Sequence, residues 1–124
     1  MGDFRKLKVW QASVTWVEQI YRATEGFPAR ERYGLSAQLR RSAVSVASNI
    51  AEGAARNMPK ETRYHVRVAA GSLAEARTQC LLAARLGFID KPTAGRLAGS
   101  AQIIRAMLAA LGRRLGTDPD SSSS

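Results

Sequence analysis

Apolar residues recur at spacings of three and four along most of the chain, and this period restricts the fold more than any other feature. Such spacing gathers side chains on one face of an α-helix, whereas a half-buried strand alternates at every second residue. The pattern predicts an all-α chain. Its four blocks run from about Phe4 to Thr24, from between Pro28 and Leu35 to about Ala55, from Pro59 to Leu86, and from about Lys91 to Leu115.

Turn residues between the blocks support this division. Gly26 and Gly87 suit helix ends, and Asp90 is a plausible N-cap for the last block. Because short connections force neighbouring helices to reverse direction, we expect an antiparallel up-down four-helix bundle over residues 1–115. The remaining stretch, GTDPDSSSS at 116–124, has too few apolar residues to fold and is predicted to be a disordered tail.

The chain is basic and has one cysteine. Its 124 residues fit a single domain, and 19 Lys and Arg against 10 Asp and Glu give a formal charge of +9, which favours polyanionic partners such as RNA or DNA. Cys80 cannot form an internal disulfide, and the N-terminal MGDFRKLKVWQAS lacks the apolar run of a signal peptide, so a cytoplasmic location is expected. No stretch is long and apolar enough to span a membrane, and no membrane partner is expected.

The first helix has a wider apolar arc than a bundle seam needs. Two adjacent stripes cover about half of its circumference, against roughly 100° for an ordinary core-facing helix. The surplus fits either a wide core face or a subunit interface, and we favour an interface that carries Trp16 and Ile20. The stripes are Leu7, Trp10, Val14, Val17 and Tyr21, and Val9, Ser13, Trp16 and Ile20.

The second helix has a polar side of mostly short residues, within the segment LRRSAVSVASNIAEG. Short Ser and Asn side chains allow another helix to approach closely, whereas a solvated face usually carries long charged residues. We therefore predict a buried hydrogen-bonded network between helices or subunits, in which Glu75 on the third helix needs Arg40 or Arg41 as its cation; the alternative is that Glu75 faces water. The predicted network comprises Arg41, Asn49, Glu52, Ser72 and Glu75.

The third helix carries a cationic stripe without an acidic residue in it. Five cations fall within an arc of about 100°, which fits phosphate contact and a solvated face equally well. No RNA-binding motif or stacking platform accompanies them in the sequence. The candidate nucleic-acid-binding residues are Lys60, Arg63, Arg67, Arg77 and Arg85.

Residues suited to catalysis are few. One histidine and one cysteine exclude a His or Cys metal cluster within the chain, and the pair Glu61 and His65 fits a surface contact better than a ligand set. No glycine-rich phosphate loop is present, and no histidine lies near Ser45 or Ser48 in the sequence to activate them. We therefore predict no enzymatic activity, no metal and no cofactor.

Several segments together resemble a known family. The order of LKVWQASV, YRATEGFPARERYGLSAQLRRSAVSVASNIAEGAAR and VAAGSLAEARTQCLLAARLGFI is similar to bacterial four-helix-bundle proteins encoded in intervening sequences of 23S rRNA genes, over residues 4 to about 112. The resemblance implies a four-helix bundle. A relative, the accessory variability determinant of diversity-generating retroelements, is a basic pentameric ring that binds nucleic acid and a reverse transcriptase, so a homopentamer is expected here. We do not expect a reverse transcriptase as a partner of this chain on the basis of the resemblance.

These features together predict a non-enzymatic, basic, oligomeric bundle that binds nucleic acid as a scaffold or chaperone. The alternative is a protein-interaction module whose positive charge serves solubility and which has no nucleic-acid role. Bound nucleic acid in the purified protein separates the two hypotheses.

Overall fold

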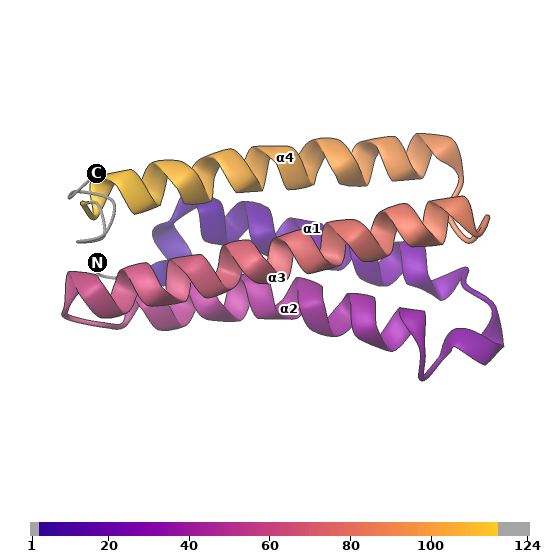
Figure 1. Cartoon of the computed structure of the whole chain (residues 1–124), viewed down its shortest axis with the longest axis horizontal. Coiled ribbons are helices and arrows are strands. Elements are labelled where there is room, and N and C mark those ends of the chain that lie inside the picture. The colour runs from indigo at the N-terminus through magenta and orange to yellow at the C-terminus, as the bar shows by residue number, and fades with distance from the viewer. Residues whose placement is uncertain (1–2, 117–124) are drawn as a thin grey trace.

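The computed structural model describes residues 3–116, which contain four α-helices and no strand. The helices are α1 (Lys8–Glu25), α2 (Leu35–Ala54), α3 (Pro59–Arg85) and α4 (Lys91–Arg114). Short 3-10 turns at Phe4–Lys6 and Ala29–Glu31 precede α1 and α2. Figure 1 shows successive helices running in opposite directions, so the predicted all-α four-helix bundle is confirmed. None of the described helices combines the length and apolarity needed to cross a membrane.

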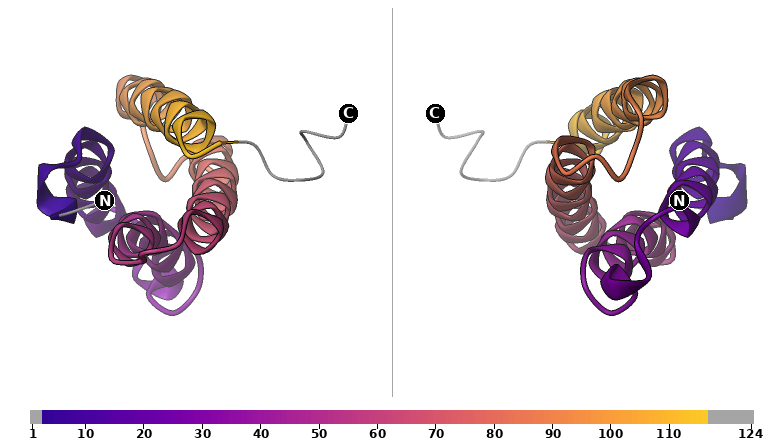
Figure 2. Two further views of the ribbon diagram at one scale, coloured as in Figure 1. Left: turned by 90° about the vertical axis from the view of Figure 1, so that its left-hand side faces the viewer. Right: turned by 90° about the vertical axis from the view of Figure 1, so that its right-hand side faces the viewer.

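All four helices contribute to one apolar core. Viewed from its ends, the bundle places the helices in chain order around the core, with α4 beside α1 (Figure 2). Each helix buries one stripe of residues spaced by three or four, as the sequence period requires. The largest fully buried apolar side chains are Trp16, Ile20, Leu39, Val46, Ile50, Leu73, Ile104 and Leu108.

Trp16 and Ile20 lie inside a single chain, so the predicted subunit interface at these residues is wrong. Their side chains are 1% and 0% exposed. The physical reason is the position of α4, which covers this side of α1 and accepts a hydrogen bond at the Leu97 carbonyl from Trp16 Nε1, at 3.1 Å. Trp10, on the other stripe, packs edge-on against Phe4 with ring centroids 5.1 Å apart and is half-buried. The stripe that contains Trp16 and Ile20 is therefore part of the core, whereas the neighbouring stripe is only half-buried and ends at Tyr21, which is 40% exposed.

Tight turns set the ends of α3. Before it, the chain reverses over only four residues after Ala54, and Thr62 Oγ1 donates to the Gly53 carbonyl at 2.9 Å. A Cβ at Gly53 would lie 3.1 Å from His65 Cβ, so glycine allows this close approach. At the other end, Gly87 has φ +79°, and the Phe88 N–H donates to the Ala83 carbonyl at 2.9 Å.

The predicted boundaries agree with the described helices to within a few residues. The clearest difference is at the start of α1, where Phe4–Lys6 form a separate 3-10 turn and the α-helix begins at Lys8. Apart from Gly116, the stretch predicted to be a disordered tail lies outside the described residues.

Candidate nucleic-acid interface

The five cations of the predicted α3 stripe have different environments. Lys60, Arg67 and Arg85 are exposed, whereas Arg63 and Arg77 are half-buried. Three cations of the stripe are therefore exposed, while the other two hold part of their side chains against the bundle. Their role in nucleic-acid binding stays a prediction.

Arg63 ties the start of α3 to the end of α4. Its Nη1 donates to the carbonyl of Leu115, the C-cap residue of α4, at 2.9 Å. The last carbonyls of a helix lack intrahelical donors and carry partial negative charge, so a guanidinium there supplies both a hydrogen-bond donor and a positive charge. This contact gives Arg63 a structural role that its position in the stripe does not reveal.

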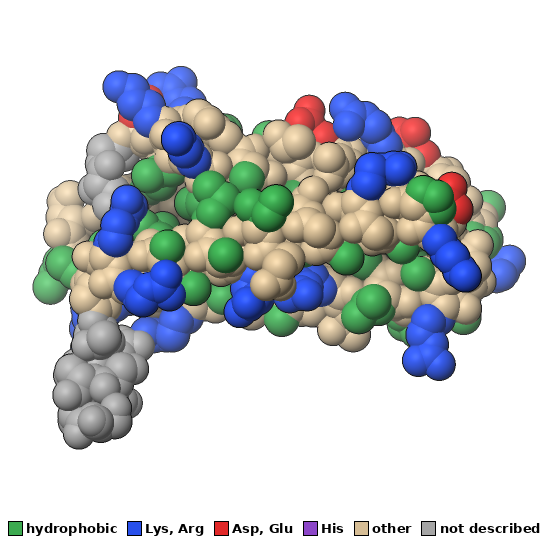
Figure 3. All heavy atoms as spheres, turned by 90° about the horizontal axis from the view of Figure 1, so that it is seen from above, with side chains coloured by type: hydrophobic (Ala, Val, Ile, Leu, Met, Phe, Trp, Pro, Cys, Tyr) green, Lys and Arg blue, Asp and Glu red, His purple; other side chains and the backbone are tan. Residues whose placement is uncertain are grey.

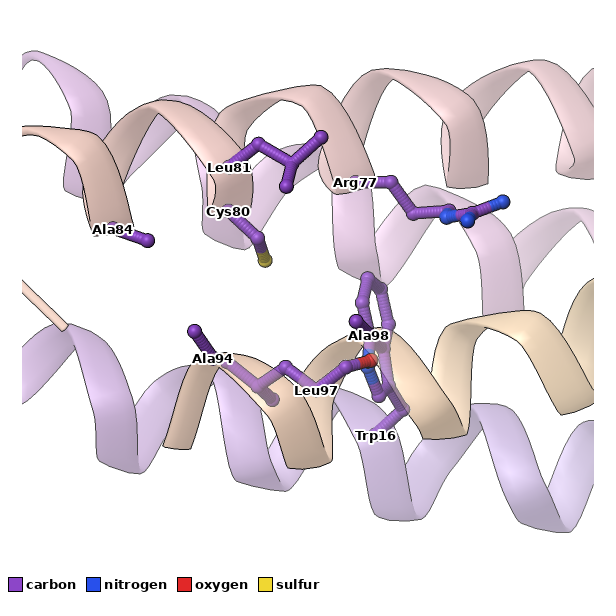
Figure 4. A pocket seen from close by; sticks show the side chains of 8 residues that line it. All are labelled: Trp16, Arg77, Cys80, Leu81, Ala84, Ala94, Leu97 and Ala98. Carbon is purple, nitrogen blue, oxygen red and sulfur yellow. The ribbon is translucent and has the colours of Figure 1, made fainter. Parts of the chain in front are cut away.

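Arg77 lines a small apolar pocket between α1, α3 and α4. The pocket has a volume of about 60 Å³, and Figure 4 shows the Trp16 ring and the Cys80 thiol beside it, while the guanidinium of Arg77 extends away along α3. Burial raises the pKa of Cys80 to about 11. The thiol is therefore protonated near neutral pH and is a poor nucleophile.

The basic surface extends onto α4, which the analysis of single helices missed. This helix contains no Asp or Glu, and residues 59–116 hold ten Lys and Arg against three Asp and Glu. Ala94 lines the pocket between α4 and α3. Arg105 lies eleven residues later, which is about three helical turns, so both residues lie on the α3 side of α4. In Figure 3, basic side chains recur along the molecule, whereas carboxylates appear only in the upper half of the view, away from α3.

A polar seam joins α2 to α3 and contains two residues of the predicted network, Asn49 and Ser72. The hydroxyls of Ser45 and Ser72 are 2.8 Å apart, and Asn49 Nδ2 donates to the Ser45 carbonyl at 2.9 Å. His65 Nδ1 lies 3.1 Å from Asn49 Oδ1. Because this oxygen only accepts, Nδ1 carries the proton in this arrangement. Ser45 and His65 were not part of the predicted network.

The charged part of the predicted network is not buried. Arg41 and Glu75 are exposed, and no ion pair joins either to another residue in the described part of the chain. They stand at the outer margins of their helices, where water solvates them, so a single chain does not form the charged part of the network; its formation between subunits stays a prediction. Glu52 is also exposed, with its Oε2 3.6 Å from His65 Nδ1.

Arg40 is the cation that packs inward from α2. Its Nε donates to Thr24 Oγ1 at 2.7 Å, and its guanidinium lies 4.5 Å from the centre of the Tyr21 ring. A hydroxyl and an aromatic ring of α1 therefore satisfy this charge in place of Glu75.

A groove of about 600 Å³ lies where the α2–α3 turn meets the first turns of α3. It contains an aromatic side chain that the sequence analysis did not single out: Tyr64 is 56% exposed and stands between Lys60 and Arg67 along the helix. The available signal was the segment KETRYHVR, in which a tyrosine stands among cations. We call this the Tyr64 groove; its lining residues are Arg56, Met58, Lys60, Glu61, Tyr64, His65 and Arg67.

Residues 3–116 contain no group of three His, Cys, Asp or Glu side chains able to hold a metal ion. Glu52 and His65 approach each other, but they form only a pair at the edge of the Tyr64 groove. The side chains that line the Tyr64 groove can supply ionic contacts, hydrogen bonds and aromatic stacking.

Comparisons with known proteins agree with this architecture. A crystal structure from Bacteroides thetaiotaomicron VPI-5482, described as a protein of unknown function from the S23 ribosomal protein family, matches with a TM-score of 0.76 and 18% sequence identity, covering 84% of this chain and 97% of that chain. At this identity the likeness concerns the fold alone. Functionally curated proteins give no match. A family profile matches residues 5–110, nearly the whole bundle, and the chain belongs to the family of 23S rRNA-intervening sequence proteins.

Proposed function

We propose that this protein is a non-enzymatic scaffold or chaperone that binds nucleic acid through the basic surface of α3 and α4. The observation that carries the proposal is the uneven distribution of charge. Residues 59–116 carry an excess of seven positive charges, against an excess of four for residues 1–58. Side chains that meet phosphates along two adjacent helices release condensed counterions, and this release drives binding without reading the base sequence.

Salt dependence is the measurable consequence of this mechanism. The logarithm of the affinity should fall linearly with the logarithm of the salt concentration, by about 0.7 to 0.9 for each contacted phosphate. Because phosphates dominate such contacts, random RNA and DNA of equal length and strandedness should bind within about tenfold of each other.

Charge removal tests the proposal with fluorescence anisotropy on labelled oligonucleotides. The variant Lys60→Gln, Arg67→Gln, Arg85→Gln removes exposed cations and keeps good helix formers. It should bind at least about tenfold more weakly, with a salt slope lower by about two to three. The triple variant Lys8→Gln, Arg22→Gln, Arg32→Gln is the control, because it makes the same charge change outside these helices. It should lose much less affinity. Equal losses in the two variants, or no binding by the parent at low salt, would contradict the proposal.

Exposed leucines favour a second candidate, a protein-interaction surface. Leu81, Leu82 and Leu86 are 64%, 48% and 55% exposed near the end of α3. Large apolar side chains gathered on a surface are typical of contact sites. We propose that a second copy of the chain covers part of this region, which replaces Trp16 and Ile20 as the candidate interface of a homo-oligomer.

A further inference from the structure

We infer that the Tyr64 groove holds an unpaired base stacked on Tyr64, so that the protein prefers single-stranded to double-stranded nucleic acid. This inference rests on the proposed function, because it names the form of nucleic acid that the basic surface takes. Stacking on Tyr64 adds a contact that the phosphates alone do not supply.

The platform is an exposed ring with a fixed support. Tyr64 packs edge-on against His65, with ring centroids 5.2 Å apart and an interplanar angle of 79°. His65 is itself held by its contact with Asn49, whose Nδ2 donates a hydrogen bond to the Ser45 carbonyl. This chain of contacts runs from the groove into the polar seam. The tyrosine is thus restrained on one side and open to a ligand over the 56% of its surface that remains exposed.

Cations surround this ring at positions suited to the flanking phosphates. Lys60 precedes Tyr64 by four residues and Arg67 follows it by three, so both are its neighbours on the surface of α3. Arg56 reaches the same groove from the α2–α3 turn, where its Nη2 lies 4.0 Å from Glu52 Oε2. Glu61 lines the groove and Glu52 stands at its edge, so three cations outnumber two carboxylates. An aromatic ring among cations is the arrangement that binds a stacked base and its backbone together.

The preference for single strands follows from the geometry of base stacking. In a duplex the faces of the bases are covered by their neighbours, so a side chain on a helix surface can stack only on a base that is unpaired or at an end. The groove volume of about 600 Å³ lies within the range of roughly 300 to 1,000 Å³ typical of sites for small organic groups. Lys60 and Arg67 can contact the phosphates of either form, whereas Tyr64 can discriminate between them.

The experiment compares a labelled oligouridine with a blunt RNA duplex of the same length, in fluorescence anisotropy with Tyr64→Leu and Tyr64→Phe. Leucine is a good helix former and the site is exposed, so the fold should persist, which circular dichroism checks. We expect Tyr64→Leu to weaken single-strand binding about tenfold, because stacking is lost. Duplex affinity and the salt slope should stay close to those of the parent, because no phosphate contact is removed. Tyr64→Phe keeps a ring and should bind like the parent.

Tyr33→Leu is the matched control. Tyr33 is 85% exposed and has the guanidinium of Arg32 5.4 Å from its ring centre. It belongs to the connection between α1 and α2, and this connection lies at the end of the bundle opposite the α2–α3 turn (Figure 1). Tyr33→Leu should leave the affinities for the single strand and for the duplex unchanged.

If Tyr64→Leu binds the single strand as tightly as the parent while the triple variant at Lys60, Arg67 and Arg85 does not, the stacking inference is wrong and the proposed function stands. Equal weakening by Tyr64→Leu and Tyr64→Phe overturns stacking in favour of a hydroxyl contact. A parent that binds neither RNA overturns both.

Discussion

The indole of Trp16 lies between α1 and α4, and its Nε1 donates to the Leu97 carbonyl at 3.1 Å. Its ring also forms a wall of the small pocket that contains Cys80 (Figure 4). A large ring with a polar atom needs both an apolar surface and a hydrogen-bond partner when it is buried. The helix that follows last in the chain supplies the partner, so the burial of Trp16 requires no second subunit.

Cys80 makes stability depend on pH in the alkaline range. Its pKa rises from an ordinary value of 9.0 to about 11 because burial disfavours the thiolate. Between these values the folded chain keeps the proton that the unfolded chain releases, so the contribution is full below pH 9 and is lost as the pH rises through 11. The free energy of unfolding should fall on the order of 2 kcal/mol more in the parent than in Cys80→Ala over this range.

Urea denaturation across that pH range measures the difference. Every other ionisable group is present in both proteins, so its contribution cancels in the comparison. Parallel curves for the parent and Cys80→Ala would contradict the assignment of a buried, protonated thiol.

At the level of the elements, α2 and α3 are joined by small polar side chains rather than by charges. Asn49→Ala removes the partner of His65 Nδ1 and a donor to the Ser45 carbonyl, both in a half-buried setting. We expect it to lower the free energy of unfolding by about 1 to 3 kcal/mol, because these groups lose their partners away from bulk water. Urea or thermal denaturation measures the loss.

Glu75→Ala is the control for this seam. Glu75 is exposed on α3, so its removal should change the free energy of unfolding by less than about 0.5 kcal/mol. A large loss in Glu75→Ala together with a small one in Asn49→Ala would mean that the charged network predicted from the sequence forms after all, for instance between subunits.

The sequence predicted the helices well because their apolar period is long and their ends are punctuated by Gly26, Gly87 and Asp90. It could not decide what covers the wide face of α1, because that depends on where α4 lies in space. The same limit applies to Arg63, whose partner Leu115 is 52 residues away in the chain. Tyr64 was missed because one aromatic residue among cations carries no periodic signal; its exposure and its groove appear only once α2 and α3 are packed.

For the whole molecule, we expect a closed homo-oligomer, and the resemblance described above favours five copies of the 13.4 kDa chain. The candidate contact includes Leu82 and Leu86, which are one turn apart on α3 and exposed. The variant Leu82→Glu, Leu86→Glu should dissociate the assembly and keep the helices, because charges cannot be buried in an apolar contact without large cost. Sedimentation velocity and circular dichroism measure the two effects.

Ile103→Glu is the control for the oligomer. Ile103 is 61% exposed on α4, so it tests whether any added surface charge dissociates the protein. A parent that sediments as a monomer at micromolar concentration would remove the case for an assembly and leave the exposed leucines of α3 to another partner.

An even number of antiparallel helices brings the first and last described residues to the same end of the bundle, beside the α2–α3 turn (Figure 1). Fluorophores, affinity tags and fusion partners attached there stand near the Tyr64 groove and compete with its ligand for space. The connections at residues 26–34 and 86–90 occupy the opposite end. They are the better attachment points for surface immobilisation and for inserted reporter domains, because a cargo placed there leaves the groove accessible.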